Sequence, residues 1–274
     1  MFECVVNISE GRDLDRLRAL SNAAGGSLRD LHHDRFHNRS VFTLINADRA
    51  LSDDVRSLID AAFNELDLTT HDGVHPRFGV VDVVPFVALE NAERPRAMAL
   101  RDETARWIAE RYDVPTFLYG EVDGRLRTLP DVRRLAFRVL EPDFGPARAA
   151  ERLGAVAVGE RPVLVAWNIW LSGATIDEAR LLAKSVRRAE VRAIGLAVGD
   201  QVQVSCNLVA PLSVGPSVVY DQVEALLGSG ARIERCELVG LAPAKLLDLE
   251  DRTRWASLGL SEEATIEGRL LAAN

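Results

Sequence analysis

Hydrophobic and polar positions in the first half of the chain predict strands and helices in the order β-α-β-β-α-β. Helices are indicated where apolar residues recur every three or four positions. Strands are indicated by short β-rich or apolar runs bounded by turn residues. The predicted elements are a strand at 2–8, a helix at 14–24, strands at 27–33 and 40–46, a helix at 51–66 and a strand at 80–87.

The second half of the chain repeats this order without visible sequence identity to the first. Its elements are a strand at 163–171, a helix at 176–186, a hairpin of strands at 193–198 and 201–209, a helix around 219–227 and a strand at 233–239. Between the halves, the pattern predicts a helix at 96–112, a strand at 116–119 and a Gly/Pro-marked segment at 142–154.

This repetition predicts an α/β (α+β) fold of two subdomains, 1–162 and 163–274. Each is expected to be a mixed β-sheet with helices packed on one face, with the β-α-β-β-α-β order repeated. A cleft between two such units is the usual place for a small-molecule site.

Composition and charge narrow the classes of function. The chain has 274 residues, 47% of them hydrophobic, and a net charge of −8. An acidic globular chain is a poor general binder of nucleic acid or of an anionic membrane, so neither partner is expected. Three cysteines far apart in the sequence favour a reducing cytosol over a disulfide framework. No secretory signal or membrane helix is predicted, so we expect a cytoplasmic protein.

The segment 71–79 reads HDGVHPRFG and is the strongest chemical signal in the chain. Gly73 and Pro76 exclude a helix, so the pattern predicts a shaped loop before a buried strand. A loop histidine has a pKa suited to acid and base work, and Arg77 is suited to bind a carboxylate. The alternative is that His71 and His75 only cap or brace the loop.

A metal site is the weaker interpretation of the histidines. His33 and His37, and likewise His71 and His75, have a spacing that occurs among ligands, with Asp34 or Asp82 as a carboxylate. Neither pair lies on a predicted helix that would fix its geometry, and no HExxH motif is present. No metal is therefore expected.

Polar residues in the second half mark one face of a predicted strand. In the strand 201–208, Gln203, Ser205 and Asn207 alternate with apolar positions. They form either a solvated sheet face or a wall of donors and acceptors for a ligand. Asn168 lies in an otherwise apolar strand, where its amide must be satisfied by the backbone or by a ligand.

Several strings of the sequence, in the same order, resemble those of the glutamate formiminotransferase family. They include ECVVNISEGR at 3–12, HNRSVFT at 37–43, HDGVHPRFGVVDVVPF at 71–86, PDFGP at 142–146 and QVSCNL at 203–208. The resemblance covers nearly the whole chain. It implies the formiminotransferase part alone, in two α/β subdomains with folate between them, without a cyclodeaminase part.

The resemblance also implies an activity. It is the tetrahydrofolate-dependent transfer of a formimino group from N-formimino-L-glutamate to N5 of tetrahydrofolate, a step of one-carbon metabolism in histidine degradation, by a homodimer. Tetrahydrofolate would be a co-substrate. The histidine before Pro-Arg, His75, matches the family's proposed acid and base.

Other positions follow from the matched strings and from the chemistry of the substrates. Donor carboxylates call for arginine, and an amide or carboxylate would orient the histidine or the substrate. The expected substrate-binding residues are Asn7, Glu10, Asn38, Arg39, Arg77 and Asp82. The expected folate-binding residues are Gly145, Pro146, Gly154, Asn168, Arg187, Gln203, Ser205 and Asn207.

Two departures from the family pattern keep other functions open. Asp72 and Val74 stand where family members usually have Lys and Glu, and the segment 147–153 matches only at its ends. A diverged formimidoyl or formyl transferase of specialised metabolism, with another donor or acceptor, is one alternative. A non-catalytic folate-binding homologue is the other, although the retained His75 and Arg77 oppose it.

Overall fold

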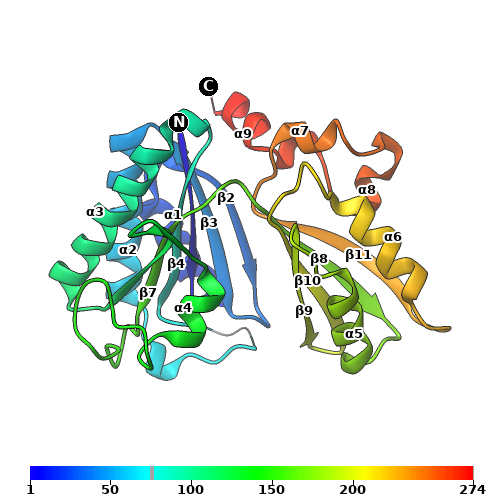
Figure 1. Ribbon diagram of the computed structural model, residues 1–274, viewed down its shortest axis with the longest axis horizontal. Helices are drawn as coiled ribbons and strands as arrows, with labels where there is room; N and C mark the ends of the chain where they lie inside the picture. The colour runs from blue at the N-terminus through cyan, green and yellow to red at the C-terminus, as the bar shows by residue number, and fades with distance from the viewer. Residues whose placement is uncertain (75–76, 274) are drawn as a thin grey trace. The chain divides into compact units, whose positions relative to one another are not determined.

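The protein is described by a computed structural model that covers residues 1–74 and 77–273. The chain forms two compact units, Met1–Pro162 and Val163–Asn274. Figure 1 shows the elements of each unit, and each unit is described by itself.

The first unit is built on a mixed sheet with the strand order β2-β3-β1-β4-β7-β5-β6. Strand β1 pairs antiparallel with β3 and β4, whereas β7 runs parallel to both of its neighbours, β4 and β5. The strands are β1 (Phe2–Ile8), β2 (Leu28–Asp34), β3 (Arg39–Asn46), β4 (Val81–Ala88), β5 (Thr116–Val122), β6 (Arg125–Arg127) and β7 (Val156–Glu160).

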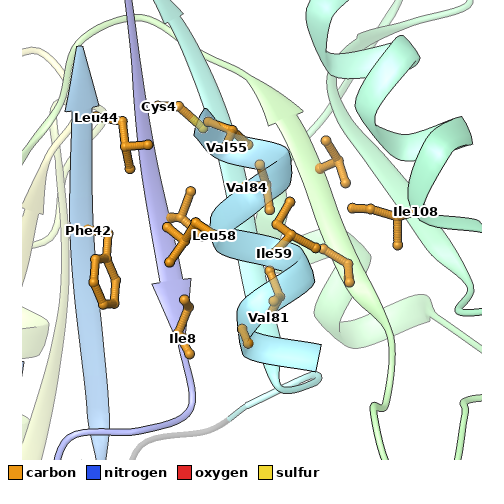
Figure 2. Close-up of a cluster of buried hydrophobic side chains, with 14 of the residues drawn as sticks. Cys4, Ile8, Phe42, Leu44, Val55, Leu58, Ile59, Val81, Val84 and Ile108 are labelled. Carbon is orange, nitrogen blue, oxygen red and sulfur yellow. The ribbon is translucent and has the colours of Figure 1, made fainter. Parts of the chain in front are cut away.

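The helices α1, α2 and α3 cover one face of this sheet. Asp13 begins α1 by accepting hydrogen bonds from the amides of Asp15 and Arg16. The apolar positions that predicted α2 are buried against the strands, as Figure 2 shows for Val55, Leu58 and Ile59. The helices are α1 (Leu14–Ala23), α2 (Asp48–Glu65), α3 (Arg94–Tyr112) and α4 (Leu129–Leu135), with 3₁₀ turns η1 (Gly25–Ser27), η2 (Leu68–Thr70) and η3 (Asn91–Glu93).

The core of the first unit follows from alternation along the strands. Cys4 and Ile8 of β1 and Phe42 and Leu44 of β3 point toward α2 and are fully buried (Figure 2). Burial of such a side chain stabilises a fold by about 1.5–3 kcal/mol. These contacts hold the end of β1, and with it the segment that follows.

Helix α4 departs from the expectation of helices on one face. Its Val132 packs with Val83, Phe117, Tyr119 and Ala157, which form a cluster separate from the main core. Parallel strands are usually buried on both faces, and the additional strands β7 and β5 present apolar residues on the second face. Helix α4 covers that face where β4, β7 and β5 meet.

The second unit has the sheet order β11-β8-β10-β9, with α5 and α6 along one face (Figure 1). A mixed sheet was expected here, but the strand pairs among the described residues are all antiparallel. The parallel pairs of the first unit involve β7 and β5, and the second unit has no counterpart of these strands among its described residues. The elements are β8 (Val165–Ser172), α5 (Ile176–Val186), β9 (Val191–Val198), β10 (Gln201–Leu208), α6 (Pro216–Leu226), β11 (Arg232–Val239), α7 (Ala244–Leu247), η4 (Arg252–Arg254), α8 (Trp255–Leu258), η5 (Glu262–Ala264) and α9 (Ile266–Ala272).

The two units share the predicted repeat. The order β2-β3-β1-β4 in the first sheet corresponds to β9-β10-β8-β11 in the second. Both arise from the chain order β-α-β-β-α-β, the split-βαβ arrangement. The repetition read from the sequence is therefore confirmed. In the described ranges, no helix is both long and apolar enough to cross a membrane.

Candidate active site

Three connections of the first unit meet at one end of its sheet. Ile8, the last residue of β1, pairs with Ser40 in β3 and with Val81 in β4. The segment after β1, the β2–β3 turn at 35–38 and the connection at 66–80 between α2 and β4 therefore lie together. We call 66–80 the histidine loop; His75 and Pro76 within it lie outside the described residues.

The β2–β3 turn anchors the histidine loop. Asn38 has a φ of +47°, a left-handed conformation that asparagine tolerates better than most residues. Its Nδ2 donates to the Asp72 carbonyl at 2.7 Å, and its Oδ1 accepts from the Gly11 amide at 3.0 Å. The amide of Val74 donates to the Phe36 carbonyl at 3.3 Å. Asn38 thus joins all three connections.

Gly73 lets the loop approach the turn closely. A Cβ added at Gly73 would collide with the carbonyl oxygen of His37. From the other side, Arg77 donates from Nη1 to the Gly73 carbonyl and from Nη2 to the His71 carbonyl, both at 3.0 Å. Arg77, expected to bind substrate, therefore braces the two residues that flank Asp72.

His71 is held by a hydrogen bond and by partial burial. Its Nε2 lies 2.8 Å from the Asn38 carbonyl oxygen, which assigns the proton to Nε2. Burial lowers the pKa of His71 below its ordinary 6.5, against the raising effect of this hydrogen bond. Its Nδ1 is buried and has no hydrogen-bond partner among the described residues. His71 therefore positions the loop and presents one basic nitrogen.

The structure brings together Asn7, Arg39 and Asp82, three of the residues expected to bind substrate. Arg39 donates from Nη2 to Oδ1 of Asn7, and the same nitrogen lies 3.8 Å from Oδ2 of Asp82. Burial lowers the pKa of Arg39, and the neighbouring Arg133 lowers it further, whereas Asp82 raises it. Asp82 is 1% exposed and accepts the Phe78 amide at 2.7 Å.

Arg133 is a member of this cluster that the sequence analysis missed. Its Nη2 donates to Oδ2 of Asp82 at 2.6 Å. Only the helix-start pattern Thr-Leu-Pro-Asp at 128–131 marks its surroundings in the sequence, and nothing there separates Arg133 from Arg134.

Glu10 acts as a brace at the start of α1. Its Oε1 accepts from the amides of Arg12 and Asp13, at 2.8 and 3.0 Å, and its Oε2 lies 3.5 Å from Nη1 of Arg16. It fixes the segment after β1, which donates the Gly11 amide to Asn38.

The residues expected to bind folate are divided between the two units. In the first, Gly145 and Gly154 have φ of +88° and +76°, and Pro146 follows Gly145. A Cβ on Gly145 would lie 2.9 Å from the Val114 carbonyl oxygen, and one on Gly154 would lie 2.5 Å from that of Phe78. Gly154 therefore permits close contact with the end of the histidine loop.

In the second unit, Asn168, Gln203, Ser205 and Asn207 lie on one face of the sheet, because Ser205 pairs with Asn168 across β10 and β8. Gln203 is fully buried, and neither polar atom of its amide has a hydrogen-bond partner within the described ranges. Such a group is costly unless something binds it, so it fits a ligand with both donors and acceptors.

Two further residues of the second unit complete this description. Glu237, which the sequence analysis missed, accepts at Oε2 from Nε1 of Trp170 at 2.9 Å and from Nδ2 of Asn168 at 3.3 Å. Arg187 donates from Nε to the Ala193 carbonyl at 2.7 Å, so it ties the end of α5 to β9.

The residues of the weaker metal interpretation have other contacts. Nδ1 of His33 lies 3.3 Å from the Gly11 carbonyl oxygen, and Asp34 accepts at Oδ1 from the amides of Phe36 and His37. Across residues 1–74 and 77–273, no group of three His, Cys, Asp or Glu side chains is arranged to hold a metal ion.

Comparison with known proteins shows which family the chain resembles over its length. The family model of the formiminotransferase domain, N-terminal subdomain, matches residues 1–161. The chain is 33% identical over 273 residues to glutamate formimidoyltransferase from Streptococcus pyogenes serotype M1, with 90% of each chain covered. It is 29% identical over 275 residues to glutamate formimidoyltransferase from Thermoplasma acidophilum, with 90% of this chain and 89% of that protein covered.

A longer relative matches over the same region. Identity to formimidoyltransferase-cyclodeaminase from Gallus gallus is 30% over 279 residues, which is 90% of this chain and 51% of that protein. These similarities and the repeated fold define an enzyme of the transferase class. The chain belongs to the formiminotransferase family.

Proposed function

We propose that this chain transfers a formimino group from N-formimino-L-glutamate to N5 of tetrahydrofolate. The observation that carries the proposal is the 33% identity spanning nine tenths of both this chain and a glutamate formimidoyltransferase. The reaction would belong to histidine degradation and would take place in the cytoplasm. The protein would act as a homodimer, in which each chain has the two subdomains 1–162 and 163–274.

His75 is the acid and base of the proposed mechanism. Tetrahydrofolate supplies the nucleophilic nitrogen N5. The His75 imidazole accepts the proton that N5 loses and returns it to the glutamate nitrogen as that nitrogen leaves. The described neighbours of His75 support this role, because hydrogen bonds hold them in place. Asp72 and Val74 bind the β2–β3 turn, and Arg77 binds the backbone of the histidine loop.

The remaining residues of the loop end bind or orient the donor. Arg39 and Arg77 supply the cations that its carboxylates require. Asn7 and Asp82 orient Arg39, and Glu10 and Asn38 hold the segments on either side. A preset arginine loses less freedom on binding, which favours tight recognition.

Tetrahydrofolate is bound, in this proposal, by Gly145, Pro146 and Gly154 of the first unit. Asn168, Arg187, Gln203, Ser205 and Asn207 contribute from the second. The unpartnered, buried amide of Gln203 supports this assignment, because the edge of a pterin offers neighbouring donors and acceptors.

A second candidate function is transfer from or to a different small molecule. The observation that favours it is the exposure of Asp72 and Val74, which replace the family's usual Lys and Glu on the histidine loop. A changed charge pattern on an exposed part of the loop would alter the recognition of a charged donor.

The test uses the full chain with N-formimino-L-glutamate and tetrahydrofolate. We expect 5-formiminotetrahydrofolate and L-glutamate to form in equal amounts, measured by mass spectrometry. Product from N-formyl-L-glutamate or another formimino-amino acid alone would establish the second candidate instead. A folded protein whose melting temperature is unmoved by both folinic acid and tetrahydrofolate would contradict folate binding, since a ligand of the native state raises that temperature.

A further inference from the structure

A bulky aromatic residue occupies a strained backbone position just after helix α4. Phe137 has a φ of +58°, which lies in the left-handed region. Among the described residues, the other non-glycine positions with a positive φ are Asn38, Asp113 and Asp123, whose short polar side chains tolerate this conformation. A large side chain adopts it rarely and at a cost in free energy, and such positions cluster at functional sites.

The turn at 135–140, which we call the α4 turn, holds the backbone of Phe137. The amides of residues 138–140 all donate to the Leu135 carbonyl, at 3.0 to 3.1 Å. The Phe137 amide donates to the Leu140 carbonyl at 3.0 Å. These hydrogen bonds fix the direction in which the Phe137 side chain leaves the backbone.

The ring of Phe137 packs against the end of the histidine loop. Its centroid lies 6.0 Å from that of Phe78 and 5.0 Å from that of Phe117. The centroids of Phe78 and Phe117 are 5.3 Å apart, so the three rings form one cluster. Phe117 is fully buried, whereas Phe137 is 39% exposed. Phe137 is therefore the exposed member of a cluster that holds the side chain of Phe78.

Helix α4 also holds the backbone of Phe78. The Phe78 amide donates to Oδ1 of Asp82 at 2.7 Å, and Oδ2 of Asp82 accepts from Nη2 of Arg133 on α4 at 2.6 Å. The helix and its turn thus fix both the backbone and the side chain of this residue. Phe78 follows His75 by three residues, a span of at most about 10 Å of chain. The placement of Phe78 therefore limits where the histidine can lie.

We infer that Phe137 is a positioning residue of the active site. Its ring fixes Phe78 and, through Phe78, the histidine loop that carries His75. The strained φ of Phe137 is the cost of placing a large ring against the end of this loop. The inference rests on the proposed function, in which His75 moves the proton between the two nitrogens.

The test compares Phe137→Gly with Phe137→Ala by steady-state kinetics and thermal unfolding. Both variants lose the ring, but glycine also relieves the strain at this φ, whereas alanine keeps it. Phe137→Gly should therefore have the higher melting temperature of the two, while both share one loss of kcat. We expect kcat to fall about 10- to 100-fold, as for a displacement of a catalytic group by about 1 Å. The KM values for N-formimino-L-glutamate and tetrahydrofolate should change less than about threefold.

Two further variants serve as rescue and control. Phe137→Tyr keeps the ring at a partly exposed position and should retain the wild-type kcat. Asp123→Gly relieves the same backbone conformation in the turn between β5 and β6 and should leave kcat unchanged. A loss of kcat in Phe137→Ala that Phe137→Gly does not share would assign Phe137 to stability alone and overturn the inference. A rise of either KM without a loss of kcat would also overturn it.

Hydrogen exchange measured by mass spectrometry tests the inference without turnover. The hydrogen-bonded amides of Val74, Phe78 and Val80 should exchange faster in Phe137→Gly than in the wild type, whereas those of α2 should not change. Equal exchange of the loop in the two proteins would overturn the inference whatever the kinetics. If the wild-type chain transfers no formimino group, the proposed function fails; faster exchange of the loop in Phe137→Gly then still supports the positioning of the loop by Phe137.

Discussion

The two units share one strand order but differ in the connection that precedes the fourth strand of the repeat. In the first unit this connection is the histidine loop, 66–80, which contains the turn η2. In the second unit the corresponding connection between α6 and β11 is only 227–231. The segment after the first strand is also longer in the first unit, 9–13 against 173–175.

These connections lie at the same end of each sheet. Ile8 pairs with Ser40 and Val81 in the first unit, and Leu171 pairs with Val202 and Ile233 in the second. The repeat thus supplies the same frame twice, and the longer connections add reactive groups at one copy of its loop end. A fold positions a site, but the site itself depends on what its loops carry.

The largest expected effect is a difference in turnover between variants of the two connections. His75→Ala should lower turnover about 10²- to 10⁴-fold, the usual range for loss of a general acid and base. Ser229→Ala, in the corresponding connection of the second unit, should leave turnover unchanged. Steady-state kinetics checks both, and near-normal turnover of His75→Ala would transfer the role to another residue, with His71 as the first to test.

A smaller effect is expected where the connections differ in backbone packing. Gly73→Ala places a Cβ against the carbonyl oxygen of His37, so the histidine loop must shift. We expect kcat to fall about 10- to 100-fold, since a displacement near 1 Å has this effect on catalysis. Gly228→Ala is the matched control, because its Cβ would have only ordinary contact, at 3.5 Å, with Glu178. Equal turnover of the two variants would contradict the close packing of the loop.

The carboxylates of the two sheets should differ in their contribution to stability. The side chain of Asp82 is 2% exposed and lies between two guanidinium groups and a backbone amide. The side chain of Glu237 is 22% exposed; it accepts from an indole and an amide, and it lies 3.5 Å from Nη1 of Arg235. Asp82→Asn should lower the free energy of unfolding by about 1–3 kcal/mol. Glu237→Gln should lower it by about 1 kcal/mol or less. Denaturant unfolding at pH 7 measures both, and the reverse ranking would contradict this comparison.

The smallest effect concerns a buried acidic residue of the first sheet. The corresponding position of the second sheet has no acidic residue. Glu3 is the second residue of β1, where β8 has Ala166. Burial raises the pKa of Glu3 from 4.5 to about 7, although Arg161 opposes the rise. The folded state therefore favours the protonated form of Glu3. The contribution of Glu3 to the free energy of unfolding is complete below pH 4.5 and is lost as the pH rises through 7.

Glu3→Gln should consequently stabilise the protein relative to wild type at pH 8, by on the order of 1 kcal/mol. The difference should disappear toward pH 4.5. Chemical denaturation across this pH range measures it, with the exposed Glu65→Gln as a control that shows no such trend. A difference that does not grow between pH 4.5 and 7 would show that Glu3 is not the responsible group.

Local pattern was enough to predict the repeated elements of the fold. The predicted strand at 2–8 and helix at 176–186 match β1 and α5, and the other repeat elements differ at their ends by a few residues. Leu14 has the apolar spacing of Leu17 and Leu20, which are buried, but it is 60% exposed, because the helix begins at this residue after the Asp13 cap. Helix α4 and the parallel insertion of β7 depend on distant pairings that periodicity does not contain.

Only those residues of the candidate site that lie within the short matched strings of the sequence could be predicted. The loop 71–79 and the pairing of Asn7 with Arg39 involve residues that the matched strings contain. Arg133 and Glu237 were missed, because each meets its partner across about 50 to 70 residues of chain. The roles of Arg77 and Glu10 depend on hydrogen bonds to backbone groups, which the identity of a side chain does not reveal.

The position of β7 has a consequence for the order of events during synthesis. Strand β7 is the last of its sheet to be made, yet it lies between β4 and β5. Until residue 160 has left the ribosome, these two strands lack their shared neighbour, and Gly79 lacks its partner Gly154. Such distant pairings form slowly. The growing chain therefore carries the whole histidine loop, together with the β2–β3 turn that anchors it, before the pairing of Gly79 with Gly154 can be added beside β7.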